Sequence, residues 1–494
     1  MHTPSLEQFL TRCEQGNLVP VYREILADLE TPVSAFLKIG GGANSFLLES
    51  VAGGEQIGRY SFIAGDPSMV VKTKGREVEI RREGRTETRT LADGEDPLHL
   101  LKELMRGFRF VADPELPPFC GGAVGFLSYD TVRFFERLPD LTPDDRGLPD
   151  TYFVFTDTLL IFDHVKHRIK VLCLARVGSD PRAAYAEAVE KIERLVAQLK
   201  QPLPHPETEP VPREEPLEVT SIPSREEHEA AVLRAKEYIA AGDIIQVVLS
   251  RRMEAKVRAT PFEVYRALRS VNPSPYMFFL QFEDCQLIGA SPETLVTERE
   301  GSVVTRPIAG TIRRGKTLAE DAELEAELLA NPKERAEHIM LVDLHRNDIG
   351  RVCEYGSVHV DQLMVTEKYS HVIHIVSNVV GRLRPEKDAY DLIRAAFPAG
   401  TLSGAPKIRA MQIIEELEPV KRGPYGGVIG YFSYNGNMDT AITLRTIVMQ
   451  NGTAYIQAGG GIVADSDPEA EYQETVNKAG ALLRAVELAE RGLE

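Results

Sequence analysis

A single Pro-rich segment divides this 494-residue chain into two regions of unequal length. Residues 199–223, LKQPLPHPETEPVPREEPLEVTSIP, contain seven Pro and several Glu, a composition that favours an extended connection over a packed helix or strand. We therefore expect an N-terminal region over 1–198, a linker over 199–223 and a second region over 224–494. This length suffices for two domains or for one large two-lobed unit.

Short β-branched and aromatic runs predict strands in both regions. The predicted strands are 45–50, 59–65, 69–74, 77–84, 151–163, 243–257, 428–436 and 439–464, the last with a hairpin turn at QNGT. The predicted helices are 182–200, 224–242, 318–350 with a break near Pro332, and 465–492, where Asp467 and Pro468 are start signals. Strands outnumber short crossovers, which indicates an α+β fold.

Charge and composition exclude several classes of protein. The net charge of −17 disfavours non-specific binding to nucleic acid or to an anionic membrane, although a local basic pocket can still bind a small dianion. The start, MHTPSLEQFL, lacks the features of a secretory signal, and apolar runs such as 151–162 are too short to span a bilayer. The five Cys form no CxxC pair, which argues against a zinc site and favours a reducing, cytoplasmic location.

Two pairs of Glu have a spacing that suits a metal site. Glu334 and Glu337, like Glu471 and Glu474, are three residues apart in predicted helices, so each pair shares one helix face. Two such faces brought together would offer oxygen ligands to Mg²⁺. The alternative is that these are solvated helix residues, since acids in a first turn also suit the helix dipole.

A second group of residues is suited to binding a carboxylate. Gly459, Gly460 and Gly461 in QAGGGIVAD allow backbone N–H groups to approach an anion closely. Arg445, within the apolar run TAITLRTIV, needs a carboxylate partner from the protein or from a substrate.

Candidate acid–base groups are fewer. His371 and His374 lie in YSHVIHIVSNVVG and serve either acid–base chemistry or the core. Glu293 follows a Ser-Pro turn in GASPETLV, a rigid way to present a carboxyl group. No nucleophile elbow, P-loop or HExxH pattern occurs, so a covalent Ser or Cys mechanism has little support.

Taken together, eight ordered blocks resemble the chorismate-utilising enzymes, and among them the large subunits of anthranilate synthases. The blocks are GDIIQVVLSRR (242–252), NPSPYMFFL (272–280), GASPE (289–293), RPIAGTIRRG (306–315), KERAEHIMLVDLHRND (333–348), PAGTLSGAPKIRAMQIIEELEP (398–419), GPYGGVIGYFSYNGNMDTAITLRT (423–446) and QAGGGIVADSDPEAEYQETVNKA (457–479). LLES (47–50) and GGAVGFLSYD (121–130) extend the resemblance into the N-terminal region. The resemblance implies a two-lobed antiparallel β-sheet sandwich flanked by helices.

The resemblance also implies roles for these residues around chorismate and Mg²⁺. Glu337 and Glu474 would be the principal metal ligands, with Glu334 and Glu471 beside them. Arg445, Tyr425 and Gly459–Gly461 would hold the enolpyruvyl carboxylate, and Gly310, Thr311 and Thr401 would line the pocket. Glu293 would protonate the departing C4 hydroxyl, and His374 would lie near the ring.

Two positions bear on the nucleophile. Relatives that add water carry Lys in place of Gln246, and a neutral amide cannot activate water. Common 4-aminating relatives carry Lys in place of Ala309, whose methyl group cannot attack the ring. The resemblance therefore implies amination at C2 by ammonia, with the 4-aminating synthase and a non-catalytic tryptophan-sensing scaffold as alternatives.

Partners and regulation follow from the same resemblance. The chain lacks a glutaminase signature, so a separate glutamine amidotransferase subunit would supply ammonia, within a heterotetramer. LLES resembles an element that binds tryptophan as a feedback inhibitor. The implied effector residues are Leu48, Glu49, Ser50, Arg59, Pro275, Tyr276, Met277 and Tyr431.

Overall fold

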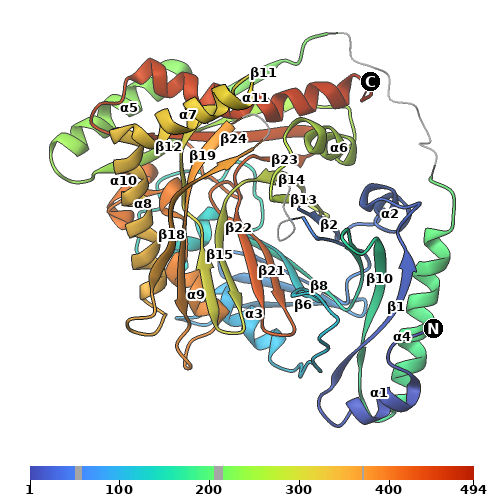
Figure 1. Ribbon diagram of the computed structural model, residues 1–494. Coiled ribbons are helices and arrows are strands. Elements are labelled where there is room, and N and C mark those ends of the chain that lie inside the picture. The colour runs from blue at the N-terminus through green and yellow to red at the C-terminus, as the bar shows by residue number, and fades with distance from the viewer. Residues whose placement is uncertain (51–57, 205–214, 370–371, 494) are drawn as a thin grey trace.

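A computed structural model describes residues 1–50, 58–204, 215–369 and 372–493 (Figure 1). Within these residues, two antiparallel sheets of 12 strands each lie at the centre of the molecule. This is the α+β arrangement of two large sheets flanked by helices that the sequence predicts.

Sheet A contains, in spatial order, β1 (Leu18–Leu26), β10 (Arg168–Arg176), β9 (Thr158–Asp163), β3 (Tyr60–Ala64), β2 (Ser45–Glu49), β13 (Tyr276–Gln281), β14 (Gln286–Ser291), β23 (Thr446–Gln450), β24 (Thr453–Ile462), β12 (Gln246–Lys256) and β11 (Val219–Ile222), with β20 (Gly404–Ala405) paired to β12. Sheet B contains β17 (Ile308–Arg313), β19 (Val372–Arg382), β16 (Ser302–Thr305), β15 (Thr294–Arg299), β22 (Met438–Ile442), β21 (Val428–Ser433), β7 (Gly122–Leu127), β8 (Thr151–Thr156), β4 (Met69–Lys74), β5 (Glu77–Arg82) and β6 (Arg85–Thr90), with β18 (His359–Lys368) paired to β19.

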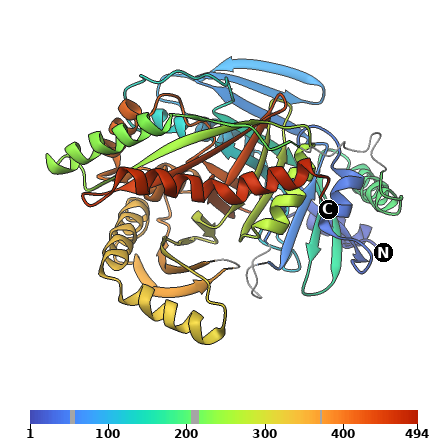
Figure 2. The same cartoon turned by 90° about the horizontal axis from the view of Figure 1, so that it is seen from above.

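The helices lie around these sheets. They are α1 (Leu6–Arg12), α2 (Pro32–Ile39), α3 (Pro97–Met105), α4 (Pro181–Leu199), α5 (Arg225–Ala240), α6 (Pro261–Val271), α7 (Leu318–Ala330), α8 (Pro332–Gly350), α9 (Ala389–Ala396), α10 (Lys407–Leu417) and α11 (Pro468–Glu490), with the 3₁₀ turns η1 (Tyr129–Phe134) and η2 (Gly400–Leu402). Seen from above, α11 runs across the outer face of sheet A (Figure 2). None of the described helices has both the length and the apolar character needed to cross a membrane.

The Pro-rich segment divides the sequence but not the sheets. In sheet A, β2 of the N-terminal region pairs with β13 of the second region, and in sheet B, β7 pairs with β21. Both ends of the segment expected as a linker are also regular structure: α4 continues to Leu199, and β11 forms an edge strand on β12. Residues 205–214 lie outside the described residues.

Two runs predicted as continuous strands each cross from one sheet to the other. Residues 151–163 form β8 in sheet B and β9 in sheet A, with a break at Asp157. Residues 439–450 likewise form β22 in sheet B and β23 in sheet A. Arg445 lies in the connection with a φ of +49°, so the prediction of a strand at Arg445 was wrong. Both runs are rich in apolar residues without a regular alternation, because most residues on both faces of each strand are buried.

Predictions from local capping signals were confirmed. Ser224 and Glu227 form a reciprocal capping box at the start of α5, and Asp467 caps α11. Asn331 separates α7 from α8 and accepts hydrogen bonds from the first N–H groups of α8. The QNGT turn joins β23 to β24, with left-handed residues at Asn451 and Gly452.

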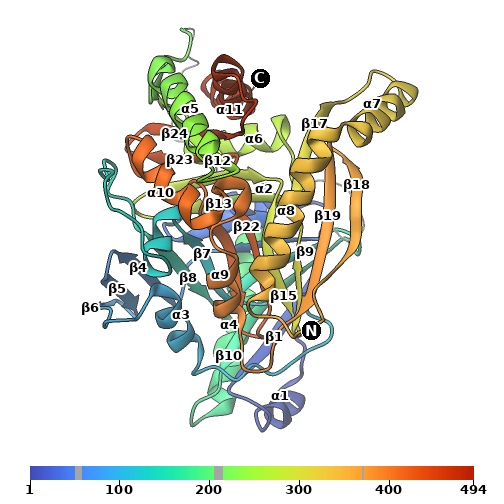
Figure 3. The same ribbon diagram turned by 90° about the vertical axis from the view of Figure 1, so that its left-hand side faces the viewer.

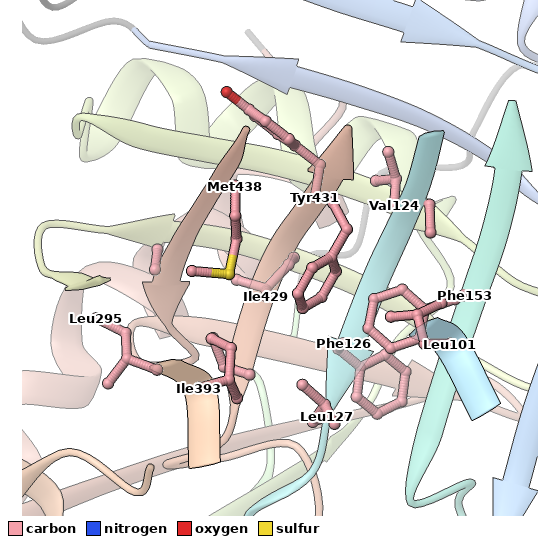
Figure 4. Packing of buried hydrophobic residues seen from close by; sticks show 14 of the residues in the cluster. Leu101, Val124, Phe126, Leu127, Phe153, Leu295, Ile393, Ile429, Tyr431 and Met438 are labelled. Atoms are coloured by element: carbon pink, nitrogen blue, oxygen red, sulfur yellow. The ribbon is translucent and has the colours of Figure 1, made fainter. Parts of the chain in front are cut away.

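Two large hydrophobic cores hold the layers together. One lies between sheet A and the outer helices α4, α6 and α11. The other fills the space between the sheets and continues beneath α3 and α9, where Leu101 and Ile393 pack with side chains of β7, β8, β15, β21 and β22 (Figure 4). In Figure 4, Tyr431 on β21 points away from Leu127 and Ile393, and its ring stacks on Phe119. The two cores fix the sheet edges and helices that carry the candidate site.

Candidate active site

Two helices contribute the four predicted carboxylates. Glu334 and Glu337 lie near the start of α8, which runs alongside β17 and β19 (Figure 3), and Glu471 and Glu474 lie near the start of α11. Burial, together with the negative charges of Glu337 and Glu474, raises the pKa of Glu334 above its ordinary value. The two helices therefore bring like charges close enough to interact across the site.

The chemistry of these carboxylates fits a hard cation. Glu471 Oε1 accepts a hydrogen bond from Ser466 Oγ at 2.6 Å, whereas Glu471 Oε2 is buried and has no hydrogen-bond partner in the described part of the chain. Its pKa is raised by burial, with the charge of Glu474 acting in the same direction. An orphaned carboxylate oxygen beside further acids suits Mg²⁺. The described residues nonetheless contain no cluster of three or more His, Cys, Asp or Glu already arranged around one metal position.

The three glycines lie on β24 where neighbouring side chains leave no room for a Cβ atom. A Cβ at Gly460 would lie 2.8 Å from Glu471 Oε2, and one at Gly461 would lie 2.3 Å from Gln246 Nε2. The ladder between β24 and β23 covers Thr453–Ile456, so the glycine stretch lies beyond that pairing while it remains paired to β12. Backbone groups of this stretch therefore face the site, as the Gly459 carbonyl shows by accepting a hydrogen bond from Lys478 Nζ at 2.9 Å.

Arg445 is a largely buried cation without a direct side-chain partner among the described residues. Within the described residues its guanidinium forms neither a hydrogen bond nor an ion pair. Burial lowers the pKa of Arg445, while Tyr425, Glu474 and Glu293 oppose that shift electrostatically. A buried guanidinium of this kind is prepared for an external anion, preferably a planar carboxylate.

Glu293 is a buried acid that remains protonated at neutral pH. It lies between β14 and β15 with 6% of its surface exposed, and Oε1 has no hydrogen-bond partner among the described residues. Burial raises the pKa of Glu293 to about 8, an effect that the Thr401 hydroxyl and the cations Lys478 and Arg445 only partly offset. The Thr401 hydroxyl, on η2, is near this carboxyl and is also buried, but it forms no hydrogen bond of ordinary geometry in the described structure. Glu293 can therefore donate a proton at pH 7.

His374 lies on β19 opposite the strand that carries Ala309. Its Nδ1 lies 3.0 Å from the Gly310 carbonyl oxygen and 3.1 Å from Thr311 Oγ1, and burial lowers its pKa. The imidazole is therefore neutral at pH 7. Its ring also packs edge-on against Tyr369 with centroids 5.4 Å apart. His371, the other candidate histidine, lies outside the described residues.

A bulge in β17 explains why Gly is required at position 310. The register between β17 and β19 shifts between Ala309 and Thr311, and Gly310 has a φ of +67°. A Cβ at Gly310 would lie 3.1 Å from Glu334 Oε2, so the bulge brings β17 against α8. Ala309 therefore occupies the strand position next to the bulge.

Gln246 begins β12 and joins the two halves of the site. Gln246 Nε2 donates a hydrogen bond to Glu337 Oε1 at 3.3 Å and lies against Gly461 of β24, while the strand partner of Gln246 is Ala405 on β20. The amide is buried, with 4% of the residue exposed. A neutral donor here holds a predicted metal ligand without adding charge.

Sequence reasoning missed Lys478. On α11, Lys478 Nζ lies 2.5 Å from Glu474 Oε1 and also bonds to the Gly459 carbonyl oxygen. The positive charge of Lys478 acts to lower the pKa values of Glu293, Glu471 and His374. The signal was available, since Lys478 follows Glu474 by four residues, but that spacing also describes an ordinary surface ion pair on a helix.

The predicted effector residues all line one cavity between the two sheets. This cavity has a volume of about 740 Å³ and is separate from the helix pair α8 and α11. Its lining includes Leu48, Glu49, Ser50, Arg59, Pro275, Tyr276, Met277 and Tyr431. Glu49 already accepts hydrogen bonds from Tyr265 Oη at 2.5 Å and from Arg269 Nε at 3.0 Å, whereas Ser50 Oγ is buried and unpaired in the described structure. We refer to this space as the effector cavity.

Comparisons with known proteins agree with this architecture. A family model described as chorismate binding enzyme matches residues 46–484. "Anthranilate synthase component 1" of Acetivibrio thermocellus is 48% identical over 493 residues, covering 99% of each chain, and that of Aquifex aeolicus is 48% identical with the same coverage.

Solved structures give the same result for the fold. The crystal structure of anthranilate synthase component I from Streptococcus pneumoniae matches with a TM-score of 0.76 and 39% identity, over 93% of this chain and 99% of that one. The menaquinone-specific isochorismate synthase of Escherichia coli shares the fold alone, with a TM-score of 0.70 and 19% identity over 98% of this chain and 99% of that one. A family match over most of the sequence and relatives of nearly half identity over its full length show that this chain belongs to the chorismate binding enzymes.

Proposed function

We propose that this chain is the chorismate-converting large subunit of an anthranilate synthase. It adds ammonia to C2 of chorismate with loss of the C4 hydroxyl as water, and then eliminates pyruvate to give anthranilate. The full-length relatives named anthranilate synthase component 1 support this reaction. The observation that carries it is the juxtaposition of a protonated buried acid, Glu293, with a buried cation, Arg445, that has no ion-pair partner in the described part of the chain.

Binding of the substrate begins with its two carboxylates. Arg445, the backbone near Tyr425 and the N–H groups of Gly459–Gly461 hold the enolpyruvyl carboxylate, since a guanidinium and backbone N–H groups both suit a planar anion. Glu337 and Glu474 would hold Mg²⁺, with Glu334 and Glu471 beside them. The ion would neutralise the ring carboxylate, which the four glutamate carboxylates would otherwise repel.

Loss of the C4 hydroxyl requires a proton, because hydroxide is a poor leaving group. Glu293 supplies this proton to the leaving oxygen, and its raised pKa keeps it in the acidic form at pH 7. Thr401 is placed to orient the leaving group or the carboxyl. His374, neutral and held by the Gly310 carbonyl, lies near the ring for the later elimination, in which the C2 proton leaves and pyruvate departs.

The nucleophile is ammonia rather than water or a lysine. Gln246 is bound to Glu337 as a neutral amide and cannot remove a proton from water. Ala309 presents a methyl group beside the β17 bulge and cannot attack the ring. Ammonia needs no activating base, so the absence of Lys at both positions favours direct amination. Amination at C4 by a related synthase, and a tryptophan-sensing scaffold without activity, are the competing functions.

Ammonia is supplied by a glutamine amidotransferase subunit in a cytoplasmic heterotetramer. The five cysteines support a separate source: four of them are buried, and none forms a hydrogen bond with a histidine of the described residues, as a glutaminase nucleophile would. Burial raises the pKa of Cys120 to about 12, which keeps its thiol protonated and unreactive. The isolated chain would therefore use free ammonium.

The effector cavity binds tryptophan as a feedback inhibitor. Its volume suits an amino acid with a large aromatic side chain, and its lining combines Met277, Tyr276 and Tyr431 with charged groups. The chain contains no Trp, so the fluorescence of added tryptophan, excited beyond the absorption of tyrosine, reports binding without a background from protein tryptophan.

The first test is the reaction itself. Purified protein is mixed with chorismate, magnesium and an ammonium salt at mildly alkaline pH, and blue anthranilate fluorescence is followed. We expect product that disappears with a chelator and decreases with tryptophan. Consumption of chorismate without anthranilate would favour amination at C4 or addition of water, and a lack of consumption even with the amidotransferase present would favour the scaffold.

A further inference from the structure

A second cavity lies outside both the active site and the effector cavity. It has a volume of about 560 Å³ and is bounded by the start of α2, the β9–β10 turn, α6 and the end of α11. The helices α2 and α6 pack directly, since the rings of Phe36 and Phe262 stack with centroids 4.7 Å apart, and Figure 1 shows these helices on the same side of sheet A. We call this space the α6 pocket.

Basic side chains dominate the polar lining of the α6 pocket. Arg266 and Arg269 come from α6, and His164 and His167 come from the β9–β10 turn. Within the described residues, Arg266 has neither a hydrogen bond nor an ion pair. His164 uses Nε2 in a 2.7 Å contact with Ser61 Oγ, which leaves its other ring nitrogen available.

The acidic residues of the pocket are already neutralised. Glu30 is paired with Lys38, and Asp163 is paired with Arg59 at 3.0 Å. Arg269 is itself paired with Glu49, so the uncompensated charge among the described lining residues is the positive charge of Arg266. Apolar groups, among them Phe162 and Leu488, line the rest of the wall. A pocket of this size, lined by both basic and apolar groups, matches a small organic anion.

We propose that the α6 pocket is a second ligand site, which binds a small molecule carrying a phosphate or carboxylate group on an apolar body. Arg266 and Arg269 hold the anionic group, and the histidines of the β9–β10 turn donate to it. This site differs from the effector cavity in its residues and in its charge.

Two ion pairs form a shared wall between the α6 pocket and the effector cavity. Arg269 lines the α6 pocket, and its partner Glu49 lines the effector cavity. Asp163 lines the α6 pocket, and its partner Arg59 lines the effector cavity. An anion bound to Arg269 competes with Glu49 for the guanidinium, which leaves the Glu49 carboxylate more available to the ammonium group of an amino acid. Occupation of the α6 pocket therefore strengthens binding in the effector cavity, a coupling that rests on the proposed tryptophan site.

Binding is tested directly by calorimetry, independently of catalysis. Phenyl phosphate, benzoate and the neutral benzyl alcohol are titrated into the full chain in a buffer without phosphate. We expect heat of binding from at least one anion and none from the alcohol, and the two anions identify the preferred head group. Arg266→Ala should weaken binding at least about tenfold, the equivalent of one strong charged hydrogen bond. Arg266→Lys should restore part of the affinity.

The matched control is Arg85→Ala, since Arg85 is an exposed arginine on β6, at the far edge of sheet B. This variant should bind the anion as the unmodified protein does. Absence of anion binding to the unmodified protein, or equal affinity in Arg266→Ala, would overturn the site.

The coupling is tested with tryptophan fluorescence. Saturating phenyl phosphate or benzoate, whichever binds, should lower the Kd for tryptophan about fivefold or more in the unmodified protein and leave it unchanged in Arg266→Ala. An unchanged Kd in the unmodified protein would refute the coupling. If tryptophan does not bind under any condition, the proposed effector function fails, while the calorimetric result for the α6 pocket stands separately.

Discussion

Replacing the buried acid Glu293 with Gln should reduce activity and increase stability at the same time. The pKa of Glu293 is raised from its ordinary 4.5 to about 8 because the ionised form is poorly solvated in the fold. The unfolded chain therefore begins to lose this proton near pH 4.5, whereas the folded chain keeps it until about pH 8. The contribution to stability is fully present below pH 4.5 and is lost as pH rises through that window.

The size of the effect follows from the shift. At pH 7 the carboxyl is ionised in the unfolded chain and mostly protonated in the folded chain. The interval from pH 4.5 to pH 7 is 2.5 units, and it lowers the free energy of unfolding by about 3 kcal/mol. Glutamine has the same shape and does not titrate, so Glu293→Gln should recover up to that amount. The same change removes the proton donor, and we expect kcat to fall about 10²- to 10⁴-fold.

Urea denaturation at pH 5 and pH 8, with kcat measured at saturating chorismate and ammonia, provides the assay. Glu298→Gln is the matched control, because Glu298 is also a buried carboxyl with a pKa raised by burial but accepts a hydrogen bond from Gly301 N outside the site. That variant should keep its activity. An active Glu293→Gln enzyme, or one whose stability falls between pH 5 and pH 8 as much as that of the unmodified protein, would refute the reasoning.

Three further changes probe the cation, the effector cavity and the core. Arg445→Gln should raise KM for chorismate about 100-fold, because a charged hydrogen-bond donor to the carboxylate is lost; steady-state kinetics will show whether KM or kcat carries the change. Ser50→Phe should place a ring in the effector cavity that clashes with bound tryptophan and abolishes its binding, measured by ligand fluorescence, while kcat stays the same. Glu418→Ala should lower the free energy of unfolding by about 3–5 kcal/mol in urea, because it leaves the buried Arg422 guanidinium without its carboxylate; a loss below 1 kcal/mol would contradict a strong buried pair.

Features that depend on neighbouring residues could be predicted from the sequence. The caps at Ser224 and Asp467 and the break before Pro332 rest on side chains within one helical turn of the backbone groups they satisfy. The Glu spacing on α8 and α11 is equally local. These signals therefore appear in the sequence as they do in the fold.

Features that depend on crossings between sheets could not be predicted in this way. The runs around Asp157 and Arg445 are apolar on both sides of the break, so composition gives no sign that the chain leaves one sheet for the other. The position of Arg445 in the site depends on this crossing, because its left-handed backbone lies at the point where β22 ends and β23 begins. Lys478 shows the same limit, since its contact with Gly459 requires α11 to lie over β24.

The backbone around Glu293 links the candidate active site to the effector cavity. Pro292 and Thr294, on either side of Glu293, both line the effector cavity, and Tyr276 Oη lies 2.8 Å from Thr294 Oγ1. A ligand that moves these neighbours must change the position of the Glu293 carboxyl, because a two-residue connection between β14 and β15 leaves little slack. Catalysis by a general acid depends on hydrogen-bond geometry, so a displacement of about 1 Å at this connection suffices to reduce the rate about 100-fold. The short connection that makes Glu293 a well-placed acid therefore also exposes it to control from the neighbouring cavity.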